Sequence, residues 1–200
     1  RKLKPKMENE FERIKRLPPY VFSEVNSLKA KLRSSGKDII DFGMGNPDMP
    51  TPEHIRKKLQ ETVDKPGTGR YSSSKGIIGL RKAQSKYYKR RFKVNLDPES
   101  EIIVTLGSKE GLANLAQAIT SPGDIILTPN PSYPIHPYGF IIAGASLRHL
   151  TAMDDGVFNQ ELFLEKLDRS IRHSVPSPKA IIVSFPSNPT AQIVDLGFYE

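Results

Sequence analysis

From about residue 76 onward, short apolar runs alternate with longer segments of helical periodicity. Apolar runs typical of strands occupy 101–106, 124–128, 145–150 and 180–185, and helix-like segments occupy 77–92, 108–119, 136–143 and 160–169. Strands joined by helices of this length pair mainly in parallel, because each helix returns the chain to the end of the sheet at which the previous strand began. Runs such as EIIVTL and AIIVSF are apolar at successive positions, as strands buried on both faces should be. The pattern predicts an α/β fold, a mainly parallel sheet with helices on both faces.

The first part of the chain has a different character. Residues 1–20 read as an arm that ends at Pro18 and Pro19, where consecutive prolines forbid a helix interior. We expect a helix at 21–33, a short strand at 38–42 and a second helix that opens near residue 52. A separate N-terminal segment therefore precedes the α/β part.

Composition excludes several classes of protein. With 200 residues, 37% hydrophobic and 26% charged, the chain can bury one full core. No apolar run approaches the roughly 18–20 residues that span a bilayer, and the charged N-terminus does not resemble a signal peptide. The chain has no cysteine, and its 4 histidines are never at metal-ligand spacing. We expect a cytoplasmic protein without a metal site or a membrane partner.

The net charge of +8 suggests a nucleic-acid partner, but its distribution argues against one. About half of the excess lies in residues 1–16, and much of the rest lies at 82–93, where it resembles the solvated face of a helix. We therefore predict no nucleic-acid partner.

Ligands of parallel α/β sheets bind outside the carboxyl ends of the strands, so the loops that follow them matter most. The first, GSKEGL at 107–112, turns at a glycine into a helix whose N–H groups suit an anion such as phosphate. The second, PNPSYP at 129–134, holds the ring of Tyr133 between prolines, as a stacking surface would be held. Taken singly, each is also compatible with an ordinary turn and with a ring packed over the sheet.

The third loop, SNP at 187–189, presents Asn188, whose amide both donates and accepts hydrogen bonds. A capping role is the alternative, whereas glycosylation is excluded because proline follows the asparagine. The segment GMGNPD at 43–48 half-resembles a dinucleotide fingerprint, but prolines block the helix that such a site needs. Together the three loops describe a pocket for a flat phosphorylated aromatic with an ionisable substituent, which is pyridoxal 5′-phosphate.

The chain resembles the N-terminal half of a class I/II aminotransferase of the fold type I pyridoxal-phosphate family. The matching segments, in the family's order, are DFGMGNPDMPTP, RYSSSKGIIGLR, TLGSKEGLANL, PNPSYP and SFPSNPTAQIVD. The details look most similar to the bacterial alanine and aspartate aminotransferase branch. The resemblance implies that residues 1–55 form the arm and a small-domain segment, and that residues 56–200 form the first part of the cofactor-binding large domain.

The resemblance also implies roles for individual residues in cofactor binding. The backbone amides of Ser108 and Lys109 would hold the phosphate, with no role implied for the Lys109 side chain. Tyr133 would stack on the pyridine ring, and Asn188 would bond the phenolic oxygen of the ring. The peptide bonds that join Asn130 and Asn188 to the prolines after them are candidates for the cis form.

Substrate binding and assembly are implied in the same way. Gly45 would line the site for the substrate carboxylate, which Asn188 would also approach. Tyr71 would reach the phosphate of a partner subunit, which makes the protein a homodimer. The Schiff-base lysine is expected beyond Glu200, so we expect no catalytic residue in this chain and no activity from it alone.

The expected reaction moves an amino group between a small amino acid, of alanine, aspartate or glutamate type, and a 2-oxo acid. Two alternatives stay open from the sequence. The first is a pyridoxal-phosphate β-lyase of the same fold, because these loops bind the cofactor without selecting the reaction. The second is a non-catalytic remnant that binds a partner.

Overall fold

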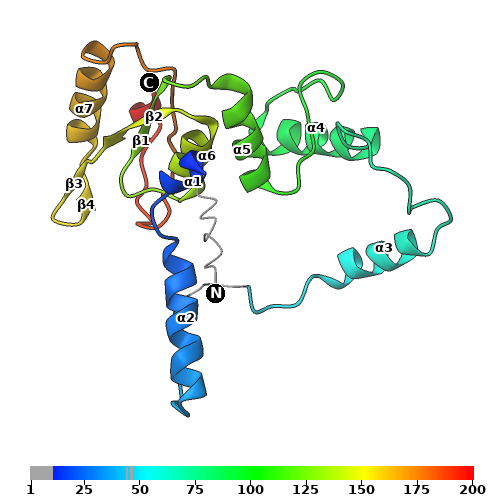
Figure 1. The fold of residues 1–200 in the computed structure, drawn as a ribbon. Coiled ribbons are helices and arrows are strands. Elements are labelled where there is room, and N and C mark those ends of the chain that lie inside the picture. Colours follow the sequence, from blue (N-terminus) through cyan, green and yellow to red (C-terminus); the bar gives the residue numbers. More distant parts are fainter. Residues whose placement is uncertain (1–10, 44, 46) are drawn as a thin grey trace, which may run out of the picture. The chain divides into compact units, whose positions relative to one another are not determined.

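The computed structural model describes residues 11–43, 45 and 47–200 (Figure 1). The chain divides into two compact units, one made of Arg1–Pro18 with Thr105–Glu200 and the other of Pro19–Val104. The expected division near residue 55 concerned the domains of the complete family fold, and it stays a prediction.

The unit Pro19–Val104 contains three helices and, in its described residues, no strand. These helices are α2 (Val21–Ser34), α3 (Glu53–Val63) and α4 (Ile78–Phe92). The prediction of a strand at 38–42 is wrong, because these residues form no ladder of backbone hydrogen bonds with another segment. Instead Asp41 accepts a hydrogen bond from Lys29 at 2.9 Å, which lowers the pKa of the Asp41 carboxyl. The segment after α2 is therefore tied to that helix by charge.

The other unit contains a parallel sheet of three strands. Strand β1 (Ile125–Pro129) lies between β2 (Ser146–Leu150) and β5 (Ala180–Ile181), and both neighbours run parallel to it. The predicted α/β class with a mainly parallel sheet is confirmed. The strand predicted at 180–185 is shorter than expected, and the one at 101–106 does not form.

Helices cover both faces of this sheet. On one face, α5 (Ser108–Ile119) and α6 (Ile135–Ala143) pack against Ile126, with Ala116 and Phe140 in the same cluster. On the other face, α7 (Gln160–Arg172) packs its Phe163 against Leu127. Alternate residues of β1 thus enter opposite cores, as a strand buried on both sides requires. The unit also contains the short helix α1 (Glu12–Lys15) and the 3₁₀ turn η1 (Gly197–Tyr199).

A two-stranded hairpin, which the sequence analysis did not predict, follows β2. Strands β3 (Met153–Asp154) and β4 (Val157–Phe158) are antiparallel. The turn is Asp155-Gly156, whose φ angles of 45° and 80° are both positive. Asp-Gly is the dipeptide that favours such two-residue turns, so the signal was present in the sequence.

No helix in the described residues is long and apolar enough to cross a membrane. Those same residues also hold no cluster of three or more histidine, aspartate or glutamate side chains arranged to bind a metal.

Candidate functional site

The N-terminus of α5 is the first part of the candidate site. Gly107 precedes the helix with φ 91° and ψ 162°, a conformation that is essentially restricted to glycine. Because glycine has no side chain, Gly107 itself makes no side-chain cap to the first turn that Ser108 opens. Glu110 reaches back from this turn and accepts the N–H of Leu106. The first-turn amides and the positive end of the helix dipole favour an anion at this terminus.

Tyr133 lies beside this helix terminus. The ammonium of Lys109 lies 5.3 Å from the centre of the Tyr133 ring, within the range of a cation–π contact. The sequence left the Lys109 side chain without a role, and no pattern in the sequence indicated this contact. The bond between Asn130 and Pro131 before this ring is cis, as predicted. The structure thus brings the predicted phosphate site and the predicted stacking ring together.

His136 is a site residue that sequence reasoning missed. Its ring meets the ring of Tyr133 edge-on, with centres 5.8 Å apart, and the backbone N–H of His136 donates to the Tyr133 carbonyl at 2.9 Å. Burial lowers the pKa of His136 below its ordinary value, which favours the neutral imidazole. The sequence signal that could have indicated this residue was its position just after the proline-rich loop, in the first turn of α6.

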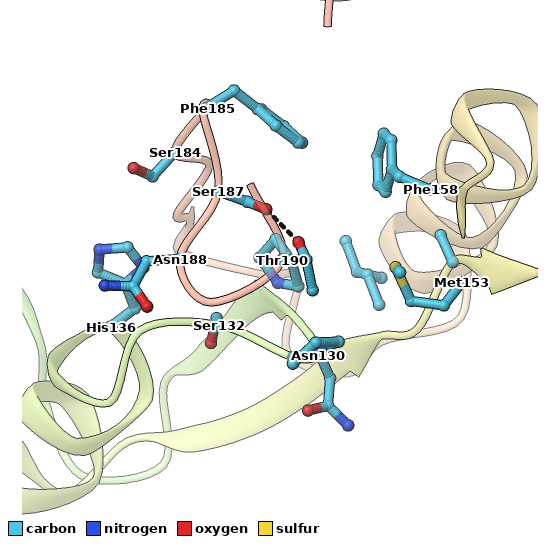
Figure 2. Close-up of a pocket in the computed structure, with 14 residues that line it drawn as sticks. Asn130, Ser132, His136, Met153, Phe158, Ser184, Phe185, Ser187, Asn188 and Thr190 are labelled. Carbon is cyan, nitrogen blue, oxygen red and sulfur yellow. Dashed lines mark hydrogen bonds between the residues drawn. The ribbon is translucent and has the colours of Figure 1, made fainter. Parts of the chain in front are cut away.

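Asn188 is presented by a turn that is closed on itself. Ser187 donates its N–H to the carbonyl of Gln192 at 2.9 Å, and Ala191 donates to the carbonyl of Ser187 at 2.8 Å. The hydroxyls of Ser187 and Thr190 also share a hydrogen bond (Figure 2). The bond between Asn188 and Pro189 is cis, as predicted. The Asn188 side chain is exposed and available to a ligand.

A small cavity lies behind the Asn188 turn (Figure 2). Asn188 and His136 line it together with residues of the β1 and β5 loops, while Phe158 of the hairpin lines it from the other side. Its volume of about 30 Å³ holds one or two water molecules. The cavity is bordered by both Asn188 and Phe158 and is not large enough for a cofactor.

The other two predicted site residues belong to the unit Pro19–Val104. A Cβ added at Gly45 meets nothing within 4 Å, and the Tyr71 side chain is fully exposed. The roles predicted for both residues stay predictions.

The residues present fit pyridoxal 5′-phosphate. Gly107 leaves the first turn of α5 open to an anion, and Tyr133 offers a ring next to it. Asn188 supplies an amide in the loop that follows β5, the strand that pairs with β1. An anion, a flat ring and an ionisable oxygen on one ligand match these three kinds of group.

Comparisons with known proteins agree with this chemistry. Residues 37–200 match the family Aminotransferase class I and II. Glutamate-pyruvate aminotransferase AlaC of Escherichia coli (strain K12) is 54% identical over 193 residues, which are 96% of this chain and 46% of that relative. An LL-diaminopimelate aminotransferase of Syntrophobacter fumaroxidans (strain DSM 10017 / MPOB) is 38% identical over 94% of this chain and 47% of its own length.

A solved structure shows the same fold. A mutant of Thermus thermophilus aspartate aminotransferase superposes with a TM-score of 0.82 at 28% identity, over 96% of this chain and 48% of the other. The chain spans about half the length of the curated relatives it matches. It belongs to the class I and II aminotransferases, a family whose cofactor is pyridoxal 5′-phosphate.

Proposed function

We propose that the complete polypeptide transfers an amino group between a small amino acid and a 2-oxo acid, with pyridoxal 5′-phosphate as cofactor. The observation that carries the proposal is the proximity of the α5 N-terminus to the Tyr133 ring, which the Lys109 ammonium contacts. The name of the E. coli relative, glutamate-pyruvate aminotransferase, supports alanine and glutamate as the amino donors to test first.

In this proposal the first-turn amides at Ser108 and Lys109 hold the cofactor phosphate, because N–H groups and the helix dipole favour an anion there. Tyr133 covers one face of the pyridine ring. Asn188 donates its amide N–H to the phenolic oxygen of the ring and thereby stabilises the deprotonated oxygen. The bound cofactor supplies the electron-withdrawing ring that stabilises negative charge at the substrate α-carbon.

Substrate binding and assembly belong to the same proposal. Gly45 leaves space for the substrate carboxylate, and Asn188 supplies a donor to that group. Tyr71 extends to the phosphate site of a second subunit, and its full exposure is compatible with such a reach. We propose a homodimer on this basis, working in the cytoplasm.

The β-lyase alternative is not favoured, because the relatives of highest identity reported above are named aminotransferases. The two reactions differ in the fate of nitrogen. An aminotransferase moves nitrogen from alanine to 2-oxoglutarate and so forms glutamate with pyruvate, whereas a lyase releases ammonia.

The test uses the full-length protein loaded with cofactor and supplied with alanine and 2-oxoglutarate. Equal amounts of pyruvate and glutamate without ammonia are the expected result, and the Asn188→Ala variant is expected to form both more slowly. Gln117→Ala, on the exposed side of α5, is the matched control and is expected to keep full activity. Ammonia in place of glutamate, or no product with any of alanine, aspartate or glutamate, overturns the proposal.

A further inference from the structure

The loop that presents Asn188 has little support from the sheet. The β1–β5 ladder ends at Ile181, and Ile182 adds one bond to Leu127 at 3.0 Å. Beyond that point the hydrogen bonds of the turn described above are internal to it. A turn that is closed on itself keeps its own shape, but its orientation requires contacts with another part of the fold.

The hairpin β3–β4 supplies two such contacts, and both come from Phe158. The ring of Phe158 lies 5.1 Å from the ring of Phe185, which precedes the turn. The backbone N–H of Phe158 donates to the side-chain oxygen of Gln192, which ends the turn, at 3.4 Å. Asn188 lies between these two attachment points in the chain. Figure 2 shows Phe158 across the cavity from the Asn188 turn.

Phe158 is itself held firmly. Its ring packs against Phe163 of α7, with centres 5.5 Å apart, and against Phe198 of η1, with centres 6.1 Å apart. Phe163 is almost completely buried at 1% exposure. Phe198 also contacts Phe185 at 5.4 Å, so the rings form a closed cluster that excludes independent movement of Phe185.

We infer that the hairpin β3–β4 sets the position of Asn188, and that Phe158 and Gln192 are positioning residues for it. The inference rests on the proposed function, since it takes Asn188 to bind the cofactor. The Phe158 ring fixes the start of the turn through Phe185, and the Phe158 N–H fixes its end through Gln192. A shift at either attachment moves the Asn188 amide away from the phenolic oxygen.

The test measures cofactor binding in the full-length protein, stripped of cofactor and titrated with pyridoxal 5′-phosphate. Its second readout is the pH midpoint of the absorption change of the bound cofactor, which a purely structural role does not move. Loss of the Asn188 donor raises this midpoint, because a hydrogen bond to an oxygen anion favours the deprotonated form.

Phe158→Leu and Gln192→Ala are the two test variants. Each is expected to weaken cofactor binding roughly two- to tenfold, the loss that corresponds to one ring pair or one hydrogen bond, and to raise the pH midpoint. Phe163→Leu is the matched control, because it removes a ring from the same cluster without touching the Asn188 turn. It is expected to lower thermal stability and, because Phe163 acts on the turn only through Phe158 and Phe198, to change both readouts less than Phe158→Leu does.

A double-mutant cycle with Asn188→Ala decides the question. If Phe158 and Gln192 act through Asn188, their variants cause no further loss of affinity when Asn188 is already alanine. Losses that multiply in the double variants, or a Phe163→Leu variant that matches Phe158→Leu in both readouts, overturn the inference alone. An Asn188→Ala variant with unchanged affinity and midpoint overturns the proposed role of Asn188 and the inference with it. Gln192→Ala carries the cycle if Phe158→Leu does not fold, because Gln192 lies outside the buried core.

Discussion

Replacement of Gly107 by alanine tests the most specific local feature of the candidate site. The residue combines φ 91° with ψ 162°, and it places the first turn of α5 directly after it. An added Cβ meets no atom within 4 Å, so the substitution causes no clash in the chain. Its entire cost is therefore conformational.

The magnitude follows from two opposing effects. A residue other than glycine in this backbone region costs about 1–3 kcal/mol. Alanine also restricts the unfolded chain more than glycine does, which offsets about 0.4–1 kcal/mol. If the backbone keeps its positive φ, we expect the free energy of unfolding to fall by up to about 2.6 kcal/mol. If it instead rotates to negative φ, the first-turn amides turn away from the phosphate.

The assay separates the phosphate from the rest of the cofactor. The cofactor-free full-length protein is titrated with pyridoxal 5′-phosphate and, separately, with pyridoxal, and the ratio of the two affinities reports the phosphate site. Where the backbone rotates, Gly107→Ala is expected to reduce this ratio about tenfold or more, because one lost hydrogen bond to a charged group is worth about 1.5–3 kcal/mol. Urea unfolding at a fixed protein concentration reports the change in stability.

Gly123→Ala is the matched control. Gly123 also has a positive φ, 93°, and an added Cβ there meets nothing within 4 Å, but it precedes β1 and not α5. We expect it to lose stability and to keep the affinity ratio. The reasoning is refuted if Gly107→Ala changes neither stability nor the ratio, or if Gly123→Ala lowers the ratio equally.

Three further predictions concern single side chains. Tyr133→Leu is expected to weaken cofactor binding roughly two- to tenfold in the same titration, because it removes one ring stack of about 0.5–1.5 kcal/mol. Burial lowers the pKa of His136 below its ordinary value of 6.5, so the unfolded chain takes up a proton first and the free energy of unfolding falls as the pH drops below that value. His136→Asn is expected to reduce this pH dependence in urea unfolding. Gly76→Ala places a Cβ in steric overlap with Cγ2 of Val104 at φ 84°, and we expect it to lower the free energy of unfolding by about 2–5 kcal/mol.

Each of these predictions has its own control. Tyr133→Phe keeps the ring and is expected to bind cofactor like the parent protein, so equal losses in both tyrosine variants contradict a stacking role. A His136→Asn variant whose stability has the same pH dependence as the parent refutes the titration argument. Gly36→Ala has a positive φ but no atom within 4 Å of the added Cβ, so it should cost less than Gly76→Ala. Equal costs would show that the contact with Val104 relaxes freely.

Local signals in the sequence predicted the helices well. The helix that begins within GSKEGL was expected at 108–119, and α5 has the same bounds. The glycine turn and the apolar periodicity that indicate it lie within a few residues of each other. The two cis bonds at Asn130 and Asn188 were also anticipated, through the family resemblance. The hairpin at 153–158 was not predicted, although the sequence contains the Asp-Gly dipeptide that favours such a turn.

Strands were harder to predict, because a strand exists only where another segment pairs with it. The run at 101–106 has the composition of a buried strand, yet Ile103 and Leu106 are exposed at 67% and 92%. Val104 donates its N–H to the carbonyl of Lys75 and not to a neighbouring strand. The composition of a segment indicates whether it can form a strand, whereas the presence of a neighbouring strand to pair with depends on the whole fold.

By itself, the sequence determined the α/β class, the three loops and the kinds of group that each presents, because these depend on residues close together in the chain. The tertiary structure alone decided which of those groups meet. It placed Lys109 over the Tyr133 ring, added His136 to the site, and set Phe158 between Phe185 and Gln192. Apart from His136, which lies close to Tyr133 in the chain, these contacts join residues far apart in sequence, and their distances follow from the packing of helices on the sheet, which no local pattern records.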